Sequence, residues 1–249
     1  MKVIVINLKK FKRFLFAFLS LLVILSLTIP LLHIHVESEP SSEYVDAMQR
    51  LNEENTIIID AGHGGEDPGA VGVNGRYEKD LNLELSILIG EGLKEEGYAV
   101  IYTRCEDKLL YTEEENIYGI RKISDLKNRC KIAAEYPFAT FVSIHMNSYG
   151  NPKYSGLQVY YGTQSEGSLR LAATIQDTVK STLQPGNNRV IKAGRNMYLM
   201  ENISGECVLI ECGFLTNPEE CEKLSKKEYQ KELSLAIVCG IIEYKENTN

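Results

Sequence analysis

TIIIDAGHGG, residues 56–65, is the stretch of the sequence that decides the fold. Its three consecutive isoleucines are typical of a strand that is buried on both faces, and the glycine-rich turn after them ends that strand abruptly. His63 lies in this turn between glycines, whose lack of a Cβ atom lets other groups approach the backbone closely. The stretch therefore predicts a buried strand that delivers a histidine to its carboxyl end, either for packing or for chemistry.

Strands and helices alternate through the rest of the chain. Further strands are predicted at Tyr98–Thr103, Phe138–His145, Gly156–Tyr161, Met197–Met200 and Gly205–Glu211. The periodicity of apolar residues predicts helices from Glu78 to Gly97 and over Ser124–Glu135, Ser168–Leu183 and Lys227–Tyr244. The charged segment Arg104–Lys122 shows neither pattern and is predicted to be an irregular excursion on the surface. We therefore expect one α/β domain over residues 56–245, with a mostly parallel or mixed twisted sheet of about six strands flanked by helices.

An apolar segment precedes this domain. Residues 14–32 contain no charged residue, and five basic residues come before Phe14. About 20 apolar residues span a bilayer, and basic residues favour the cytoplasmic side. We expect a signal or anchor segment at 1–35, transmembrane at about 14–32, followed by a polar linker at 36–55 that is partly helical in its second half. The domain would be exported, and either anchored in the membrane or secreted after cleavage of a signal peptide, although no A-x-A-like cleavage site follows.

Charge and cysteine content narrow the possible functions. Five of the 27 basic residues precede Phe14, which leaves 22 against 34 acidic residues and a net charge of −12 in the remainder. No nucleic-acid partner is expected, because binding to phosphates needs basic patches. The six cysteines could pair after export, but most lie in apolar or helical patterns, so we expect buried free thiols. No C-x-x-C motif occurs, which argues against a cysteine zinc site.

Three predicted strands end in side chains that can hold a metal or move a proton. His63 follows the first strand, His145 ends the strand at 138–145, and Glu211 ends the strand at 205–211. Functional groups of open α/β sheets collect outside the carboxyl ends of the strands. A single histidine there would most simply be a packing residue, but these are the only two histidines after residue 35. The three side chains are therefore predicted to meet at one edge of the sheet.

Glu78 completes a candidate zinc site with the two histidines. Catalytic zinc sites commonly have three protein ligands, and a carboxylate often joins two imidazoles. Glu78 stands in the first turn of a helix that leaves the same glycine-rich loop as His63, where stabilisation by the helix dipole is the alternative explanation. We expect one Zn²⁺ per chain, bound by His63, Glu78 and His145.

Three further acidic residues have to be assigned a role. Asp60 and Asp67 are rival ligands, and we interpret Asp60 as turn-forming and Asp67 as loop-capping. Glu211 then remains as the general base, which would take a proton from the attacking water and pass it to the leaving nitrogen. A purely structural carboxylate is the alternative for Glu211, although burying it after the apolar residues 208–210 would be costly.

Four motifs occur together and in order: IIIDAGHGGEDPGAVG, YEKDLNLELS, FVSIHMNS and IECGFLTNPEE. Over Thr56–Tyr244 the sequence resembles the zinc-dependent N-acetylmuramoyl-L-alanine amidases of the type-3 amidase family. The resemblance implies that His63, Glu78 and His145 are the zinc ligands and that Glu211 is the catalytic glutamate. It also implies hydrolysis of the amide bond between the lactyl group of N-acetylmuramic acid and the L-alanine of the peptidoglycan stem peptide.

The segment IRKISDLKNRCKIAAE, residues 120–135, is similar to the germination-specific amidases of spore formers. This likeness implies action on the spore cortex for the formation of muramic-δ-lactam, in the cell wall or the forespore intermembrane space. Its implied partners are peptidoglycan, the membrane through the N-terminal segment, and an accessory lipoprotein.

Other functions remain open at the level of the sequence. A vegetative cell-wall autolysin or a zinc peptidase acting on the stem peptide would use the same metal chemistry. A non-catalytic peptidoglycan-binding scaffold on an amidase fold is the non-enzyme alternative, although the presence of all four site residues argues against it. Asn147, Tyr149 and Arg195 are loop residues that we consider as glycan contacts.

Overall fold

The structure is a computed structural model that describes residues 8–34, 42–114, 116 and 120–248. The chain divides into two compact units, one up to Gln49 and one from Arg50 onward. Helix α1 (Leu8–Ile34) contains the segment predicted to cross a membrane, and α2 (Ser42–Glu54) confirms the helix expected late in the linker. Residues 35–41 of that linker lie outside the described residues. Within the described part of the chain, no helix is both long enough and apolar enough for a membrane crossing.

The second unit is built on one six-stranded sheet. Its strands are β1 (Thr56–Ala61), β2 (Ala99–Tyr102), β3 (Thr140–Asn147), β4 (Gln158–Tyr161), β5 (Lys192–Ala193) and β6 (Cys207–Phe214). They lie in the order β2-β1-β3-β6-β4-β5, and every neighbouring pair is parallel except β4 and β6. The predicted mixed α/β sheet of about six strands is confirmed.

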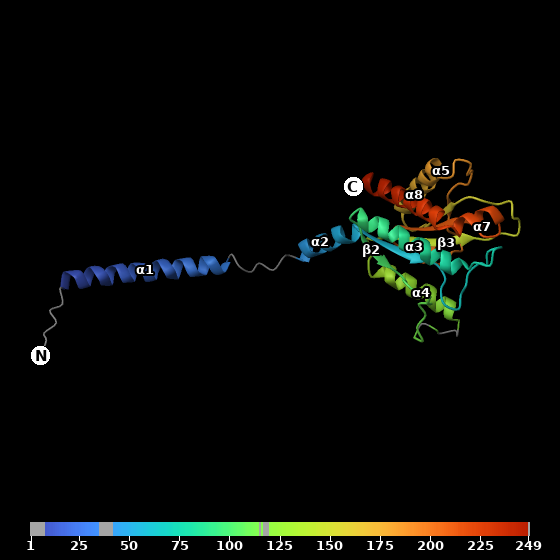
Figure 1. Cartoon of the computed structure of the whole chain (residues 1–249). Coiled ribbons are helices and arrows are strands. Elements are labelled where there is room, and N and C mark those ends of the chain that lie inside the picture. The colour runs from blue at the N-terminus through green and yellow to red at the C-terminus, as the bar shows by residue number, and fades with distance from the viewer. Residues whose placement is uncertain (1–7, 35–41, 115, 117–119, 249) are drawn as a thin grey trace. The chain divides into compact units, whose positions relative to one another are not determined.

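Strand β1 is buried on both faces, as its isoleucines predict. Ile57 and Ile59 point into the larger core, which α3 (Glu78–Glu95), α5 (Glu166–Thr182) and α8 (Lys227–Glu246) cover. Ile58 points into a smaller core under α4 (Arg121–Ala134) and α6 (Tyr198–Asn202). Figure 1 shows α5 and α8 on the opposite side of the sheet from α4. The strand is therefore the layer between two cores, and its carboxyl end has a fixed position.

The strand predicted at Met197–Met200 is wrong. Residues Tyr198–Asn202 form α6, and the edge strand β5 lies earlier, at Lys192–Ala193. Between them Asn196 has a φ of 64°, in the left-handed region, and its backbone N–H donates a hydrogen bond to Glu201. This turn stops an extended strand from continuing. A run of four apolar residues does not by itself distinguish a strand from a helix.

One short helix, α7 (Pro218–Leu224), was not predicted. Its start has a local signal, since the Asn217 side chain accepts a hydrogen bond from the Glu220 backbone N–H at 3.0 Å and Pro218 occupies the first turn. Asparagine is a favoured N-cap, and proline is favoured at the first helical position.

All six cysteines are free, which confirms the expectation of free thiols. Cys207, Cys212 and Cys221 are buried, whereas Cys105 and Cys239 are exposed, so the expected burial is wrong for these two. Burial raises the pKa of Cys207 to about 12, which keeps this thiol protonated and unreactive at neutral pH.

Two helix glycines test how tightly the larger core is packed. A methyl group added at Gly240 of α8 would lie 2.8 Å from the Cα of Ile175 in α5, whereas one added at Gly92 of α3 would lie 3.2 Å from a side-chain methyl of Val238. We expect Gly240→Ala to lower the free energy of unfolding by about 1–2 kcal/mol, because overpacking against backbone outweighs a gain in helix propensity of about 1 kcal/mol. Gly92→Ala should be neutral or stabilising. Urea unfolding measures both, and equal effects of the two substitutions would contradict this account.

Candidate metal centre

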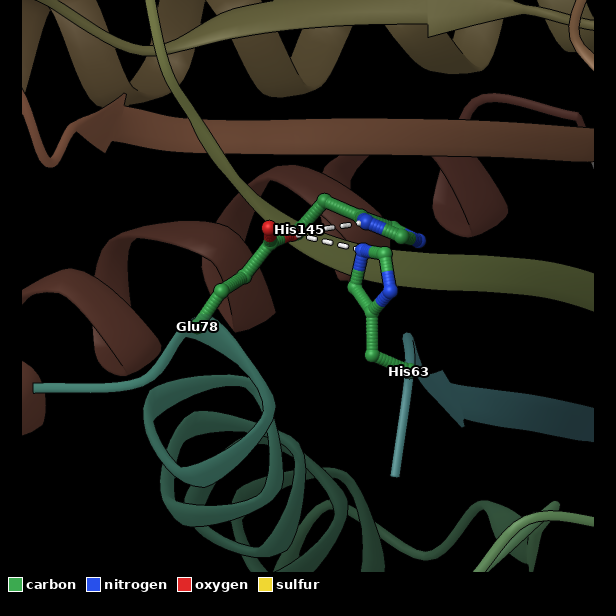
Figure 2. A group of neighbouring side chains, drawn as sticks. All are labelled: His63, Glu78 and His145. Carbon is green, nitrogen blue, oxygen red and sulfur yellow. Dashed lines mark hydrogen bonds and ion pairs between the residues drawn. The ribbon is translucent and has the colours of Figure 1, made fainter. Parts of the chain in front are cut away.

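His63, Glu78 and His145 come together at one end of the sheet (Figure 2). Each offers one ligand atom, and these atoms all lie within 4.8 Å of one another. Glu78 Oε1 is 3.2 Å from His63 Nε2 and 2.9 Å from His145 Nδ1. The structure thus places together the three residues that the sequence predicts as ligands. Among the described residues, no other such group of histidine, cysteine and acidic side chains occurs.

His63 has a left-handed backbone conformation, with a φ of 62°. This region is uncommon for a residue with a side chain, and its cost is about 1–3 kcal/mol where surrounding contacts enforce it. The contacts come from two buried arginines. Arg129 donates to the carbonyl oxygens of Ala61 and His63, each at 2.8 Å, and Arg104 donates to those of Ala61 at 2.9 Å and Gly62 at 3.0 Å. Three successive carbonyl groups are thereby fixed, and with them the direction of the His63 side chain.

Arg129 is itself held by two carboxylates. Its guanidinium pairs with Asp60 inside β1 and with Asp125 one helical turn earlier in α4. Burial alone would raise the pKa of Asp60, but Arg129 and the hydroxyl groups of Ser143 and Thr103 outweigh it and hold the pKa below its ordinary value. Asp60 is therefore a fully buried ion-pair partner within a strand, and its interpretation as a turn-forming residue is wrong.

Asp67 orients the imidazole of His63. Its Oδ2 lies 2.7 Å from His63 Nδ1, and its Oδ1 accepts a hydrogen bond from the backbone N–H of Gly69 at 3.3 Å, in keeping with the predicted loop-capping role. With Nδ1 occupied by a carboxylate, Nε2 is the nitrogen left to face a metal, an arrangement common in zinc sites. Burial lowers the pKa of His63, but hydrogen bonds and charge interactions with Glu78 and Asp67 outweigh it, so the pKa is raised.

Glu78 is anchored by backbone groups as well as by the histidines. It lies in the first turn of α3 and is 4% exposed. Its Oε2 accepts a hydrogen bond from the Ala70 N–H at 2.7 Å, and its Oε1 accepts one from the Met146 N–H at 3.1 Å. Burial would raise the pKa of Glu78, but its hydrogen bonds to His145 and His63 outweigh it and hold the pKa well below the usual range. The carboxylate is thus kept in its ionised form and held in place by these hydrogen bonds.

Two glycines provide the space that the ligands occupy. A Cβ atom at Gly62 would lie 2.2 Å from Cε1 and Nε2 of the His145 ring. One at Gly69 would lie 2.5 Å from Glu78 Oε2 and 2.8 Å from Cδ2 of His63. The glycines of this loop therefore allow the close approach that the sequence suggests.

The donor set fits a zinc ion. Bonds of about 2.0–2.1 Å in tetrahedral geometry place neighbouring ligand atoms about 3.3 Å apart. The separations of His63 Nε2 and His145 Nδ1 from Glu78 Oε1, 3.2 and 2.9 Å, are close to this spacing, and the three ligand atoms lie within 4.8 Å of one another. Two imidazoles and one carboxylate are also a ligand set that catalytic zinc sites use, with a further coordination position left open.

Glu211 lies beside this group, but not at the end of a strand. Strand β6 continues to Phe214, and Glu211 is the register partner of His145 on β3, so both side chains point to the same face of the sheet. Its Oε2 is buried and has no hydrogen-bond partner among the described residues. Burial raises the pKa of Glu211 to about 7, against the opposing effect of His145. A carboxyl group in this state can accept and release a proton near neutral pH.

The cavity at the metal group is not the largest in the molecule. A cavity of about 170 Å³ is lined by His63, His145 and residues of α4 and α6. A larger one, of about 790 Å³, is lined by residues 153–156, 183–184, 186–189 and parts of α7 and α8, and its lining contains no histidine. We assign the chemistry to the smaller cavity, because both histidines of the metal group line it. Asn147 and Tyr149 line a third cavity, of about 330 Å³, whereas Arg195 does not.

Sequence reasoning missed Arg104 and Arg129. Arg104 lies in the segment predicted to be a surface excursion, yet it is 2% exposed and holds the turn before His63. The remainder of that segment is irregular, as predicted, in the part up to Ile120 that the structure describes, whereas Arg121 and Lys122 already belong to α4. The spacing of Asp125 and Arg129, which are paired four residues apart in α4, was an available local signal, but it does not show that the pair is buried.

Comparison with known proteins adds independent information. A family model described as N-acetylmuramoyl-L-alanine amidase matches residues 57–243. The germination-specific N-acetylmuramoyl-L-alanine amidase of Bacillus subtilis (strain 168) is 39% identical over 189 residues, which cover 76% of this chain and 78% of that protein. The solved structure of the CwlD amidase from Clostridioides difficile in complex with the GerS lipoprotein has a TM-score of 0.73 and 39% identity, covering 78% of this chain and 99% of that chain. An N-acetylmuramoyl-L-alanine amidase from Clostridium difficile 630 has a TM-score of 0.68 and 31% identity, covering 78% and 98%.

Gly62→Ala tests whether the space beside His145 matters for metal binding. The added methyl group would overlap the imidazole, so the ring must turn and its Nδ1 must leave Glu78. We expect the affinity for zinc to fall at least tenfold, as it does when groups that orient metal ligands are disturbed. Competition with a chromogenic chelator measures the affinity. Gly150→Ala is the matched control, because a methyl group there meets nothing within 4 Å. A zinc affinity of Gly62→Ala within twofold of that control would contradict the assignment.

Proposed function

The chain belongs to the N-acetylmuramoyl-L-alanine amidase family, and from this premise we propose that His63, Glu78 and His145 bind a zinc ion and that Glu211 is the general base. The bond cleaved joins the lactyl carbonyl carbon of N-acetylmuramic acid to the nitrogen of L-alanine. The peptidoglycan of the cell envelope is the substrate, so the second unit works outside the cytoplasm.

The zinc ion, when bound, supplies Lewis-acid polarisation of the amide carbonyl and lowers the pKa of water. His63 presents Nε2 and His145 presents Nδ1 to it, while Glu78 contributes the one negative charge of the three ligands. Asp67 keeps the proton of His63 on Nδ1, which leaves the lone pair of Nε2 available.

Glu211 moves the protons of the reaction. Its carboxylate takes a proton from the water that attacks the lactyl carbonyl carbon, and the tetrahedral carbon then breaks its bond to nitrogen. Glu211 returns the proton to that nitrogen, which leaves as the amine of L-alanine. A pKa of about 7 suits both steps, because the same group must accept and then donate near neutral pH.

One observation carries the proposal. The buried Oε2 of Glu211 has no hydrogen-bond partner among the described residues, and it lies on the sheet face that also presents His145. An unpaired buried carboxylate oxygen costs stability, about 1–3 kcal/mol or more. Its retention next to three preorganised ligands is explained if the missing partner is the attacking water.

We further propose the spore cortex as the substrate of this chain. The relative from Bacillus subtilis is named as germination-specific, at 39% identity. The similar structure from Clostridioides difficile is a complex with a lipoprotein, and we propose that an accessory lipoprotein also binds this chain. The formation of muramic-δ-lactam in the cortex requires muramic acid without its peptide, which is the product of this reaction.

Glu211→Gln should separate metal binding from proton transfer. Glutamine has nearly the same shape but does not accept the proton, so cleavage should fall at least about 10²-fold while zinc content stays near one ion per chain. His63→Ala is the contrasting variant and should lose both metal and activity. Elemental analysis and a peptidoglycan-release assay measure the two properties. Near-normal cleavage by Glu211→Gln would sink the assignment of the base.

Digestion of purified walls tests the substrate. The chain from Arg50 onward is incubated with cortex and with vegetative sacculi, with and without EDTA, alongside the full-length protein. We expect release of intact stem peptides and peptide-free glycan by mass spectrometry, faster from cortex and abolished by EDTA. Shortened stem peptides would mean a peptidase instead, and equal rates on the two kinds of wall would argue against the cortex.

A further inference from the structure

The third cavity lies on the far side of Glu211 from the proposed metal ligands. It has a volume of about 330 Å³ and is lined by Asn147, Tyr149, Tyr154, Gln158, Tyr160, Arg189, Lys192 and Phe214. Its floor is the face of β4 and β5 (hence the β4–β5 cavity). Gln158 is the register partner of Glu211, and Lys192 is the register partner of Tyr160. Since register partners point to the same face, the row His145, Glu211, Gln158 leads directly from the metal group into this cavity.

The β4–β5 cavity is cationic in a protein with an excess of acidic residues. The whole chain has 34 acidic and 27 basic residues, yet this lining contains Arg189 and Lys192 and no aspartate or glutamate. The ammonium group of Lys192 is exposed and makes no ion pair with any residue that the structure describes. Two positive charges without an acidic neighbour in the lining favour an anionic ligand.

Arg189 is held in one orientation by its neighbours. Its Nε donates to the Ser155 carbonyl at 2.8 Å, its Nη1 donates to Gln158 Oε1 at 3.1 Å, and its guanidinium stacks over the Phe214 ring at 4.3 Å. Among the described residues, Arg189 Nη2 has no hydrogen-bond acceptor. Its N–H groups therefore remain available to bind a ligand, and the guanidinium that carries them has a fixed orientation. A preorganised guanidinium of this kind is well suited to a carboxylate.

The distances of β4 and β5 from β6 match the distances between residues of an extended peptide. Neighbouring strands are about 4.8 Å apart, so β4 and β5 lie about 5 and 10 Å from β6, which carries Glu211. An extended peptide advances about 3.3–3.6 Å per residue, which places its second and third residues about 7–11 Å from the bond cleaved. Charged groups on those residues would therefore reach Arg189 and Lys192.

We propose that the β4–β5 cavity binds the stem peptide, with Arg189 and Lys192 holding its free carboxylate groups. This inference rests on the proposed function and deepens it, because it places the peptide side of the cleaved amide bond, and not the glycan side, in the β4–β5 cavity. The peptide carries free carboxylates, including that of its second residue, a glutamate joined through its side chain. The N-acetylated glycan is uncharged, so it has no group that needs these cations.

The 790 Å³ cavity is less suited to this role. Glu219 and Glu220 line it together with its basic residues, so its charge is mixed. It shares Tyr154 and Arg189 with the β4–β5 cavity. Arg189 is therefore common to both cavities, whereas Lys192 belongs to the β4–β5 cavity alone and gives the cleaner test.

The test uses two substrates of equal glycan length that differ in one group. The second stem residue carries its α-carboxylate in one and a carboxamide in the other. For the wild-type protein we expect kcat/KM to be at least tenfold higher for the carboxylate. Lys192→Gln should reduce this ratio severalfold or more, mainly through KM. Lys231→Gln, which removes the same charge from an exposed position on α8, should keep the wild-type ratio.

Each outcome decides the proposal. A wild-type ratio near one, or an undiminished ratio in Lys192→Gln, would overturn the assignment of the cavity while leaving the amidase function standing. Failure of the wild-type protein to cleave either substrate would overturn the proposed function, and this inference with it. Arg189→Gln is a second variant, and its unfolding transition shows whether it folds; Lys192→Gln needs no such check on packing, since its side chain is exposed.

Discussion

The hydrogen bonds from two buried arginines to the backbone after β1 are the constraint on which the site depends. Arg104 and Arg129 donate hydrogen bonds to the carbonyl oxygens of residues 61–63, and these bonds hold His63 in a left-handed conformation. Such a conformation costs about 1–3 kcal/mol and persists only where other contacts impose it. Asp60 keeps Arg129 in place from inside the strand. The proposed metal ligand His63 is therefore oriented by the Arg129–Asp60 ion pair, which is not part of the metal group itself.

The register of the sheet positions the other side chains of the site. His145, Glu211 and Gln158 are neighbours across β3, β6 and β4, so one face carries a proposed ligand, the proposed base and the floor of the next cavity in a row. A slip of one residue would turn these side chains to the opposite face. The apolar residues between them, such as Ile144 and Ile210, are fully buried on that opposite face. The larger core thus fixes the register, and the register fixes the site.

The parts of this arrangement that sequence could predict are those with a local signal. His63 and His145 follow buried apolar runs, and Glu78 opens a periodic helix, so their meeting could be predicted from the rule that the carboxyl ends of strands lie at one edge, although β3 continues past His145 to Asn147. Arg129 contacts Asp60, which lies 69 positions earlier in the chain, and no local sequence pattern near either residue predicts that contact. The end of β6 was misplaced because Cys212 and Gly213 are compatible with a strand or a turn. Asn196, whose left-handed turn produces α6 instead of a strand, gives a signal only when its conformation is known.

The carboxylates that stabilise this domain differ from the carboxylate that is proposed to move protons. The proposed ligand Glu78 accepts hydrogen bonds from two backbone N–H groups in addition to its contacts with the histidines, and Asp60 is satisfied by an arginine and two hydroxyl groups. Glu211 alone among these three carboxylates keeps a buried oxygen without a partner. An unsatisfied buried oxygen destabilises the fold, so it persists only where the surrounding structure tolerates it. The arginine hydrogen bonds and the two apolar cores stabilise the domain without any contribution from Glu211. Their stability can therefore offset the cost of its unpaired oxygen. The domain can therefore hold its proposed base in an unfavourable state, with a raised pKa, without losing the geometry of the ligands beside it.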